Sequence, residues 1–234
     1  TAYIFITSNF VLNYCNIMQK YRIVWPGVKK INGLFQVWAR FNLTKRGYLE
    51  FLKERPPDAF RPGYADLWFL YRMVRQRKPK NILEFGSGIS TVIFAQALHD
   101  NYAEDPRHKG HIYSIDAEQK WAEVTEKTIP PRLRQFSRVI FGPVQKGSYN
   151  GTTVYRHANV PDIVPDLVFL DSPAEPKGAI CVDVLDVEDR LAPGFYMIID
   201  GRREMTEFLR AHMKRRYRFR YRRIFRNSVF ELIK

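Results

Sequence analysis

The stretch Asn81–Ala95, NILEFGSGISTVIFA, decides the fold. A short apolar run, NILEF, leads into Gly86-Ser87-Gly88, and the residues after Gly88 have the apolar content of a buried helix. Glycines permit a tight turn and a close approach of a ligand to the backbone, and the free N–H groups at a helix N-terminus favour negative charge. The stretch therefore predicts a strand, a ligand-binding loop and a helix.

This alternation continues to the end of the chain. Further strand-like runs occupy 111–116, 138–142, 166–171 and 195–200, and helical runs occupy 89–99, 117–129, 179–191 and 203–216. Apolar strands that alternate with helices indicate a parallel sheet covered on both faces. The segment Gln145–Pro165 contains glycines and prolines without a helical period, so we expect it to be mostly loop.

The C-terminal residues have a different pattern. In YRFRYRRI (217–224), aromatic residues alternate with arginines, which is typical of a strand with one buried face, so Tyr217, Phe219 and Tyr221 should face the core. A turn near Arg226 leads to a second strand at 228–233. The predicted fold class is α/β: a Rossmann-like, doubly wound, seven-stranded and mostly parallel sheet with a C-terminal antiparallel hairpin and an N-terminal helical extension.

The first eighty residues favour helices, at 3–21, 28–41, 44–55 and 63–77, interrupted at Pro26-Gly27 and by prolines between residues 56 and 62. We predict an N-terminal helical extension over residues 1–61 and a ligand-binding domain over residues 62–234. Residues 1–19 carry no charge, but asparagines recur at helical spacing among them. This polar stripe favours an amphipathic helix docked on the domain or a partner over a membrane-spanning helix, and peripheral membrane contact through residues 1–21 is the alternative.

The glycine loop excludes two common nucleotide sites. A P-loop requires Lys-Ser/Thr after its second glycine, whereas Gly88 is followed by Ile89-Ser90-Thr91. A dinucleotide fold requires a third glycine where Thr91 stands. Glu84, two residues before Gly86, would repel a pyrophosphate but would suit a ligand with an ammonium or sulfonium group.

The pattern LEFGSGIST (83–91) resembles the first motif of class I S-adenosylmethionine-dependent methyltransferases, particularly bacterial members with an E-F-G-S-G-x-S-T form. The resemblance covers about residues 62–234. It implies that the loop wraps the methionine part of S-adenosylmethionine, and that Asp116, at the end of the second strand, holds the ribose hydroxyls. Asp116 could also cap the next helix, and Tyr64 could pack its own helix instead of covering the cofactor. The cofactor-binding residues that the resemblance implies are Tyr64, Glu84, Gly86, Ser87, Gly88, Ser90, Thr91, Asp116, Ala117, Gly142, Pro143 and Asp171.

Asp171 and Asp200 end the fourth and fifth strands and should lie at the edge of the sheet where the cofactor binds. An oxygen nucleophile needs a general base or a metal ion for methyl transfer. We predict Asp171 as the base or as a substrate-positioning group, with Asp200 and His157 as further catalytic candidates. Methyltransferases that act on catechols or sugar hydroxyls bind a metal at this edge, but Gly201 stands where the third ligand is expected, so Mg²⁺ is an alternative that we do not favour.

The charge of the chain is uneven. Its formal net charge is +14, and eleven Lys/Arg stand against two Glu between Arg202 and Arg226. Such a field attracts nucleic acid, acidic lipid or phosphorylated substrates without choosing among them, and Arg202 and Arg203 could meet an anionic substrate or pair with nearby acids. Cys15 and Cys181 show no metal-ligand spacing and indicate reduced thiols in a cytoplasmic protein.

The resemblance implies a methyltransferase, and we expect O-methylation of a small-molecule or saccharide acceptor. Two alternatives stay open: an RNA or protein methyltransferase that uses the basic C-terminal face, and a non-catalytic binding module. We expect a cytoplasmic location, with membrane-peripheral attachment as the alternative, and the oligomeric state stays open.

Overall fold

The computed structural model describes residues 28–173, 176–222 and 225–234. Within these residues, a seven-stranded sheet has the order β3-β2-β1-β6-β7-β9-β8. The strands are β1 (Asn81–Phe85), β2 (His111–Asp116), β3 (Ser137–Phe141), β6 (Leu167–Leu170), β7 (Tyr196–Asp200), β8 (Tyr217–Arg222) and β9 (Asn227–Leu232). Strands β3, β2, β1, β6 and β7 are parallel, and β9 runs antiparallel to both β7 and β8. The predicted fold class is confirmed.

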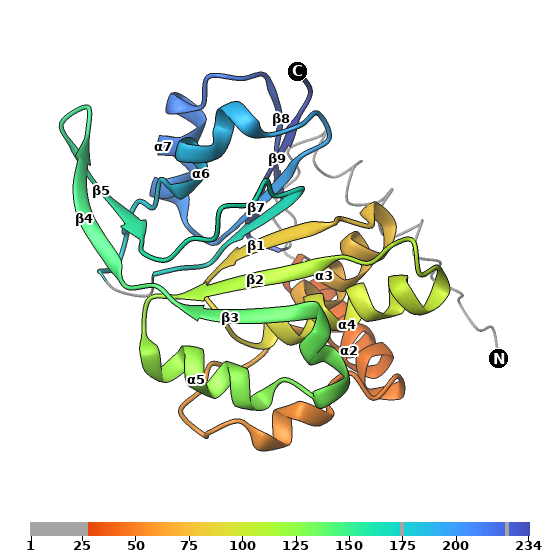
Figure 1. Ribbon diagram of the computed structural model, residues 1–234. Helices are drawn as coiled ribbons and strands as arrows, with labels where there is room; N and C mark the ends of the chain where they lie inside the picture. Colours follow the sequence, from red (N-terminus) through yellow and green to blue (C-terminus); the bar gives the residue numbers. More distant parts are fainter. Residues whose placement is uncertain (1–27, 174–175, 223–224) are drawn as a thin grey trace.

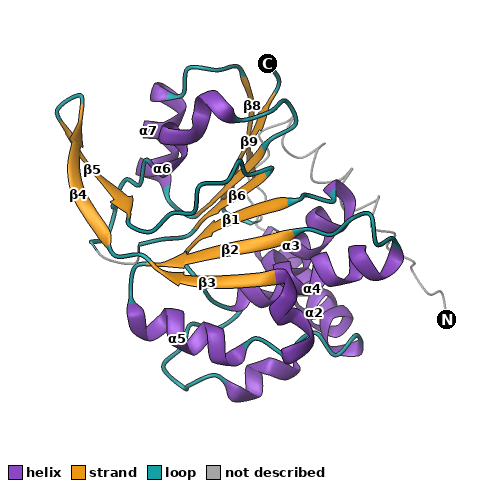
Figure 2. Ribbon diagram, viewed as in Figure 1, coloured by secondary structure: helices purple, strands orange, loops and turns teal. Residues whose placement is uncertain are grey.

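Helices cover both faces of the sheet (Figures 1 and 2). On one face lie α2 (Val28–Lys45), α3 (Tyr64–Arg77), α4 (Ile89–Glu104) and α5 (Gln119–Thr128), and on the other lie α6 (Asp183–Val187) and α7 (Arg203–His212). Short 3₁₀ helices complete the described elements: η1 (Glu50–Glu54), η2 (Pro131–Phe136) and η3 (Glu188–Arg190). Helix α4 is apolar nearly all round and is buried against the sheet, as such a helix must be.

The strand register brings the polar strand ends together. Phe85 of β1 pairs with Ile115 of β2 on one side and with Leu170 of β6 on the other, and Leu170 pairs with Ile199 of β7. Since parallel strands end at the same edge, the residues that follow these positions share one site. Among them are Gly86, Asp116, Asp171 and Asp200, as the sequence predicted.

The prediction of a mostly loop connection after β3 was wrong. Residues in this region form an antiparallel hairpin of β4 (Val144–Tyr149) and β5 (Thr152–His157), which projects beyond the edge of the sheet (Figure 1). The turn is Asn150-Gly151, with φ of 49° and 79°. Two residues with positive φ match the twist of a hairpin, which is why Asn-Gly is a strong hairpin signal.

Two further expectations need correction. The helix predicted at 44–55 does not form, because α2 continues to Lys45 and a left-handed Gly47 (φ +71°) separates it from η1. The helix predicted at 179–191 is reduced to α6 and η3.

The aromatic residues of β8 do not all face the core as predicted. Tyr217 and Phe219 pack against Phe230, but Tyr221 is 48% exposed. Tyr221 pairs with Ser228, whose small polar side chain offers little apolar surface for burial.

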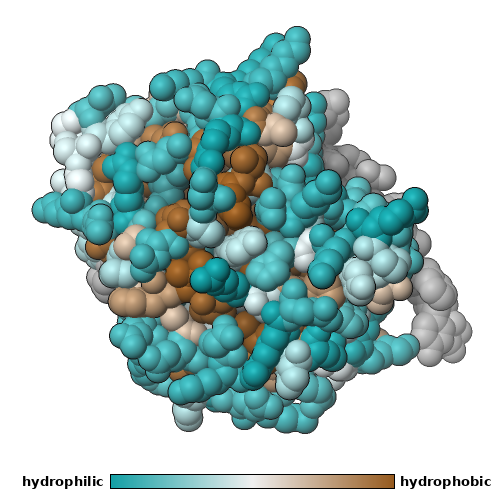
Figure 3. Space-filling model, in the orientation of Figure 1, coloured by the Kyte–Doolittle hydropathy of each residue, from teal (hydrophilic) through white to brown (hydrophobic). Residues whose placement is uncertain are grey.

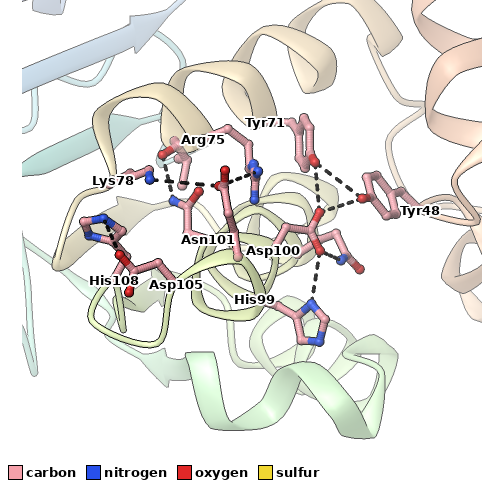
Figure 4. A network of polar contacts seen from close by, with 12 residues as sticks. Tyr48, Tyr71, Arg75, Lys78, His99, Asp100, Asn101, Asp105 and His108 are labelled. Carbon is pink, nitrogen blue, oxygen red and sulfur yellow. Dashed lines mark hydrogen bonds and ion pairs between the residues drawn. The ribbon is translucent and has the colours of Figure 1, made fainter.

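The segment before α3 is tied to the domain by specific contacts. Gln36 of α2 accepts a hydrogen bond from the N–H of Ala65 (3.0 Å), and Trp38 meets Trp68 edge to face. Figure 4 shows a second tie, in which the hydroxyls of Tyr48 and Tyr71 both reach the carboxylate of Asp100 on α4. The predicted boundary at residues 61 and 62 therefore separates two parts that pack closely together.

The predicted helix at 3–21 and its proposed membrane contact lie outside the described residues. Of the helices that the structure describes, none combines the length and the hydropathy needed to span a bilayer. The face seen in Figure 1 is mostly hydrophilic at its periphery, while hydrophobic residues reach the surface in its centre (Figure 3).

Candidate active site

The glycine loop lies directly against the segment that follows β6. Gly86 has φ of +102°, and a Cβ atom built there would lie 2.9 Å from the carbonyl oxygen of Asp171 and 3.3 Å from Cβ of Ser172. Its N–H donates to the carbonyl of Ile115 (2.8 Å). Only glycine combines this backbone conformation with so close a contact, so the loop is fixed between the ends of β2 and β6.

Glu84 stabilises the loop through buried hydrogen bonds. Its side chain is fully buried, and its Oε2 accepts hydrogen bonds from the hydroxyls of Thr91 (2.5 Å) and Ser114 (2.6 Å). The Thr91 hydroxyl in turn accepts the N–H of Gly88 (2.9 Å) at the start of α4. Burial raises the pKa of Glu84 to about 7, against the opposing effect of these hydroxyls. The second oxygen, Oε1, has no hydrogen-bond partner among the described residues.

Asp116 ties the end of β2 to the loop. Its Oδ2 accepts both the N–H (2.9 Å) and the hydroxyl (2.7 Å) of Ser87. Its Oδ1 accepts the N–H of Glu118 (3.0 Å), immediately before α5. This bond closes a turn before α5, whose N-cap is Glu118 and has no side-chain cap, so Asp116 does not cap the helix. Oδ1, with one bond, retains capacity for a further donor.

Gly142 and Pro143 lie beside Asp116. The N–H of Gly142 donates to the carbonyl of Asp116 (2.8 Å), and a Cβ at Gly142 would collide with the carbonyl of Ala158 and with Ile115. Pro143 accepts the N–H of Ala158 (3.0 Å). Backbone atoms therefore line this part of the site. The resemblance implies that Gly142 and Pro143 lie beside the adenine of the cofactor.

The remaining cofactor candidates occupy more varied positions. Ala117 is half-buried directly after Asp116, and Ser90 is half-buried in the first turn of α4. Tyr64 begins α3, packs on the core cluster, and lies beneath the guanidinium of Arg40 (5.4 Å). That arrangement agrees with the packing alternative for Tyr64.

These residues fit a bound adenosyl ligand with a positive charge. Glu84 carries a buried carboxyl oxygen without a hydrogen-bond partner among the described residues, and Asp116 can accept from a hydroxyl. These two features suit the positive charge and the ribose diol of S-adenosylmethionine.

A cavity of about 460 Å³ opens beyond β6 and β7. It is lined by Asp66, Asp171, Asp200, Gly201, Arg202, Phe225 and Arg226. Asp66, on the first turn of α3, was missed by sequence reasoning because only the packing of α3 beside the sheet brings it to this edge. Asp171 and Asp200 meet here as predicted, so the cavity carries three carboxylates.

Burial and mutual repulsion perturb these acids. Burial, followed by the nearby charge of Asp200, raises the pKa of Asp171 to about 7, although Arg202 opposes the shift. The same two causes raise the pKa of Asp66 to about 7, and burial raises that of Asp200. Asp171 is surrounded by protein yet keeps 48% of its side-chain surface exposed, so its carboxylate is both perturbed and accessible.

Arg202 holds the segment after β6. Its guanidinium donates to the carbonyl oxygens of Asp171 and Pro173, each at 2.6 Å, and lies 3.6 Å from the Asp171 carboxylate. Arg203 pairs with Glu207 on the exposed face of α7. The alternative that both arginines pair with nearby acids is confirmed.

His157 ends β5, is buried and does not line the cavity. Its Nδ1 lies 3.0 Å from Asp183 Oδ2, and its Nε2 lies 2.9 Å from the hydroxyl of Ser172. Sequence reasoning named His157 but missed both partners, which are 15 and 26 residues away and share no motif with it.

Among the described residues, no three metal-ligand atoms converge in the cavity. Within the described residues, three potential ligand atoms come within 4.8 Å of one another only at His157, Cys181 and Asp183. Both nitrogens of that histidine already have hydrogen-bond partners, and burial raises the pKa of the Cys181 thiol, which disfavours a thiolate. The carboxylates of Asp66, Asp171 and Asp200 line the cavity without forming such a cluster, and the Mg²⁺ alternative stays a prediction.

The sequence matches a family described as a methyltransferase domain over residues 83–201, about half of the chain. The match includes the glycine loop and the ends of β2, β6 and β7. With its parallel sheet and strand-end site, the chain is a methyltransferase-type α/β protein. It belongs to this methyltransferase domain family.

Solved structures share the fold. The SAH-bound methyltransferase PaMTH1 of Podospora anserina is 16% identical, with a TM-score of 0.54 over 100% of this chain and 98% of that one. The O-methyltransferase of Bacillus cereus in complex with SAH is 16% identical, with a TM-score of 0.48 over 95% and 97% of the two chains. At such identity the first similarity shows the fold alone. A comparison with curated proteins found no match.

Proposed function

We propose that this protein is an S-adenosylmethionine-dependent O-methyltransferase that acts on a hydroxyl of a small-molecule or saccharide acceptor. The observation that carries the proposal is the position of Asp171. This carboxylate follows β6, touches the glycine loop through its backbone, and faces the cavity with its pKa raised to about 7.

The residues that would hold the cofactor surround the loop. Gly86, Ser87 and Gly88 provide close backbone contact, Asp116 provides an acceptor for the ribose hydroxyls, and Gly142-Pro143 bounds the adenine side. S-adenosylmethionine, when bound there, supplies an electrophilic methyl group on a sulfonium sulfur.

Asp171 would remove the proton of the acceptor hydroxyl. A general base is most effective when its pKa lies near the working pH, and a value of about 7 meets that condition. Arg202 holds the backbone of Asp171 and Pro173, so the carboxylate is fixed at the cavity wall. Asp200 contributes by raising the pKa of Asp171.

The size of the cavity supports a small acceptor. Its volume of about 460 Å³ falls within the roughly 300–1,000 Å³ typical of small-molecule pockets. Phe225 offers one apolar surface among the carboxylates and arginines, which suits a polar ring such as a phenol or a sugar. A polymer acceptor would have to present a single residue to this cavity.

A product assay tests the proposal. Formation of S-adenosylhomocysteine would be measured with a panel of catechols, phenols and nucleotide sugars, and in parallel with RNA and basic peptides. We expect turnover with a hydroxyl compound by the wild type and at least 100-fold less by Asp171→Asn, in the range that general-base loss typically costs. If turnover occurred only with RNA or only with peptides, the acceptor would belong to that class and not to the hydroxyl compounds. No calorimetric binding of S-adenosylmethionine would refute the proposal altogether.

A further inference from the structure

Three buried side chains from separate parts of the fold form a continuous hydrogen-bonded chain. Asp183 at the start of α6, His157 at the end of β5 and Ser172 after β6 are 7%, 6% and 3% exposed, respectively. Asp183 Oδ2 lies 3.0 Å from His157 Nδ1, and His157 Nε2 lies 2.9 Å from Ser172 Oγ. This series of hydrogen bonds ends at Ser172, the residue next to Asp171.

The direction of these hydrogen bonds follows from the partners. Asp183 also accepts the backbone N–H of His157 at Oδ1 (2.7 Å), so the carboxylate holds the histidine at two points. A carboxylate can only accept, which places a proton on Nδ1, and in the neutral imidazole Nε2 is then an acceptor. The hydroxyl of Ser172 therefore donates to Nε2.

The backbone around Asp171 is fastened on its other sides. The N–H of Asp171 donates to the carbonyl of Phe85 (2.8 Å), which continues the ladder between β6 and β1. Arg202 holds the carbonyls of Asp171 and Pro173. The side chain of Ser172 is thus the remaining point of attachment in the segment from Asp171 to Pro173, and His157 occupies it.

We propose that Asp183, His157 and Ser172 act as positioning residues, which hold in place the segment that carries the Asp171 carboxylate at the cavity wall. The inference rests on the proposed function, because it assumes Asp171 to be the base. It adds a role for three residues that do not meet the acceptor: Ser172 is buried and none of the three lines the cavity.

Two other interpretations fit the geometry less well. A nucleophilic serine would have to reach the acceptor, whereas the Ser172 hydroxyl points into the protein at His157. A zinc site at His157, Cys181 and Asp183 would have to replace the hydrogen bond between His157 and Asp183 and ionise a thiol whose pKa is raised by burial. The hydrogen bonds give partners to the Asp183 carboxylate and to both ring nitrogens of His157.

The titration of Asp171 reports its position, since that carboxylate responds to several surrounding charges. These are Asp66 on α3, Glu84 on β1, Asp116 on β2, Asp200 on β7 and Arg202 at the start of α7. A change in the position of Asp171 alters its distance to each of them.

The test is a ¹³C NMR titration of the Asp171 carboxyl in the wild type, Ser172→Ala and Asp183→Asn. In the latter variant the new side-chain amide would donate to Nδ1 of His157, which moves the imidazole proton to Nε2 and reverses the hydrogen bond with Ser172 without removing volume. The matched control is Asp186→Asn, because Asp186 lies on the same helix but pairs with Arg156 at the surface. We expect the Asp171 pKa to move by at least about 0.5 units in both test variants and to stay unchanged in the control.

Two further measurements complete the test. In the wild type, ¹⁵N NMR should show a proton on Nδ1 of His157, in the hydrogen bond to Asp183. Test variants that melt at a lower temperature while Asp171 titrates as in the wild type would show a merely structural role and overturn the proposal. One tightly bound zinc per chain in the purified protein would also overturn it.

Failure of the proposed function is a separate result. A protein that methylates no hydroxyl compound could still show the shift of Asp171, which would support the positioning chain and reject the assigned reaction. Should Ser172→Ala fail to fold, the isosteric Asp183→Asn variant carries the test alone.

Discussion

Ser87 and Asp116 are joined by two hydrogen bonds to a single carboxylate oxygen, one from the backbone N–H of Ser87 and one from its hydroxyl. The residue expected to hold the cofactor ribose is thus also the residue that fixes the cofactor loop. Replacing this carboxylate should therefore disturb both cofactor binding and the conformation of the loop.

Asp116→Asn should weaken binding of S-adenosylhomocysteine about ten-fold, equivalent to roughly 1.4 kcal/mol. The asparagine side chain has only one accepting oxygen, so either Ser87 or Glu118 loses its acceptor. Isothermal titration calorimetry measures the change. Asp58→Asn, which removes an exposed charge paired with Lys120 of α5, is the control and should leave the affinity unaltered. Equal affinity of the Asp116 variant and the wild type would contradict the assignment.

Gly86→Ala should abolish measurable cofactor binding, whereas Gly151→Ala should preserve it. Both glycines have positive φ, so alanine strains both backbones by about 1 kcal/mol or more. Only at Gly86 does the new methyl group also meet the carbonyl of Asp171, at 2.9 Å; around Gly151 nothing lies within 4 Å. Calorimetry together with thermal unfolding separates the two effects. Similar losses of binding in both variants would mean that the close contact is unimportant.

The rate of methyl transfer should rise with pH and level off above about pH 7. Asp171 must be ionised to accept a proton, and burial together with Asp200 raises its pKa to about 7. A pH profile of kcat/KM tests this inflection. A rate that is flat between pH 5 and 9 would exclude Asp171 as the base.

The same pKa predicts an effect on stability. In the folded protein Asp171 holds its proton up to about pH 7, but in the unfolded chain it releases it near the ordinary value of 3.8, so the wild type loses stability as pH rises between these values. Asp171→Asn avoids that loss. The variant should melt at a higher temperature than the wild type at pH 8, and the difference should vanish below pH 4.

Asp100→Ala should destabilise the protein by roughly 2–3 kcal/mol, since hydrogen bonds to a charged group contribute about 1.5–3 kcal/mol and several share this carboxylate. Burial opposes ionisation of Asp100, yet hydrogen bonds from Tyr48 and His99 outweigh it and keep its pKa below the ordinary value. The contribution is therefore present at neutral pH and is lost only below about pH 4.

Chemical denaturation at pH 7.5 measures this loss. Asp105→Ala is the control, because Asp105 pairs with the exposed Arg107 and with His108, the latter contact being drawn in Figure 4. It should leave the midpoint nearly unchanged. A loss in the Asp105 variant as large as in the Asp100 variant would contradict the importance of the buried tyrosine contacts.

Much of the fold follows from local pattern. The alternation of apolar strands and helices predicts the parallel sheet, and the glycine loop with Asp171 and Asp200 predicts the edge where the site lies, because both signals are carried by consecutive residues. The hairpin of β4 and β5 has a local signal as well: Asn150-Gly151 is a strong turn dipeptide, although the other glycines and prolines of this segment favour a loop.

The rest of the site depends on contacts between distant segments. Asp66 reaches the cavity only because α3 packs beside the sheet, and Asp183 and Ser172 meet His157 only after β5, β6 and α6 are assembled. Neither the spacing of residues nor the composition of the chain indicates such long-range contacts. They follow from the register of strands that lie far apart in the sequence.

The tip of the projecting hairpin is a suitable site for attaching a label to the protein. Its two strands of six residues reach about 20 Å from base to tip at the usual rise per residue, and the tip glycine has open space around it. A fluorophore or peptide tag inserted at Asn150-Gly151 would stand clear of the sheet. The base of the same hairpin ends at His157, so the label would be carried by an element that is hydrogen-bonded to Ser172, the residue next to Asp171.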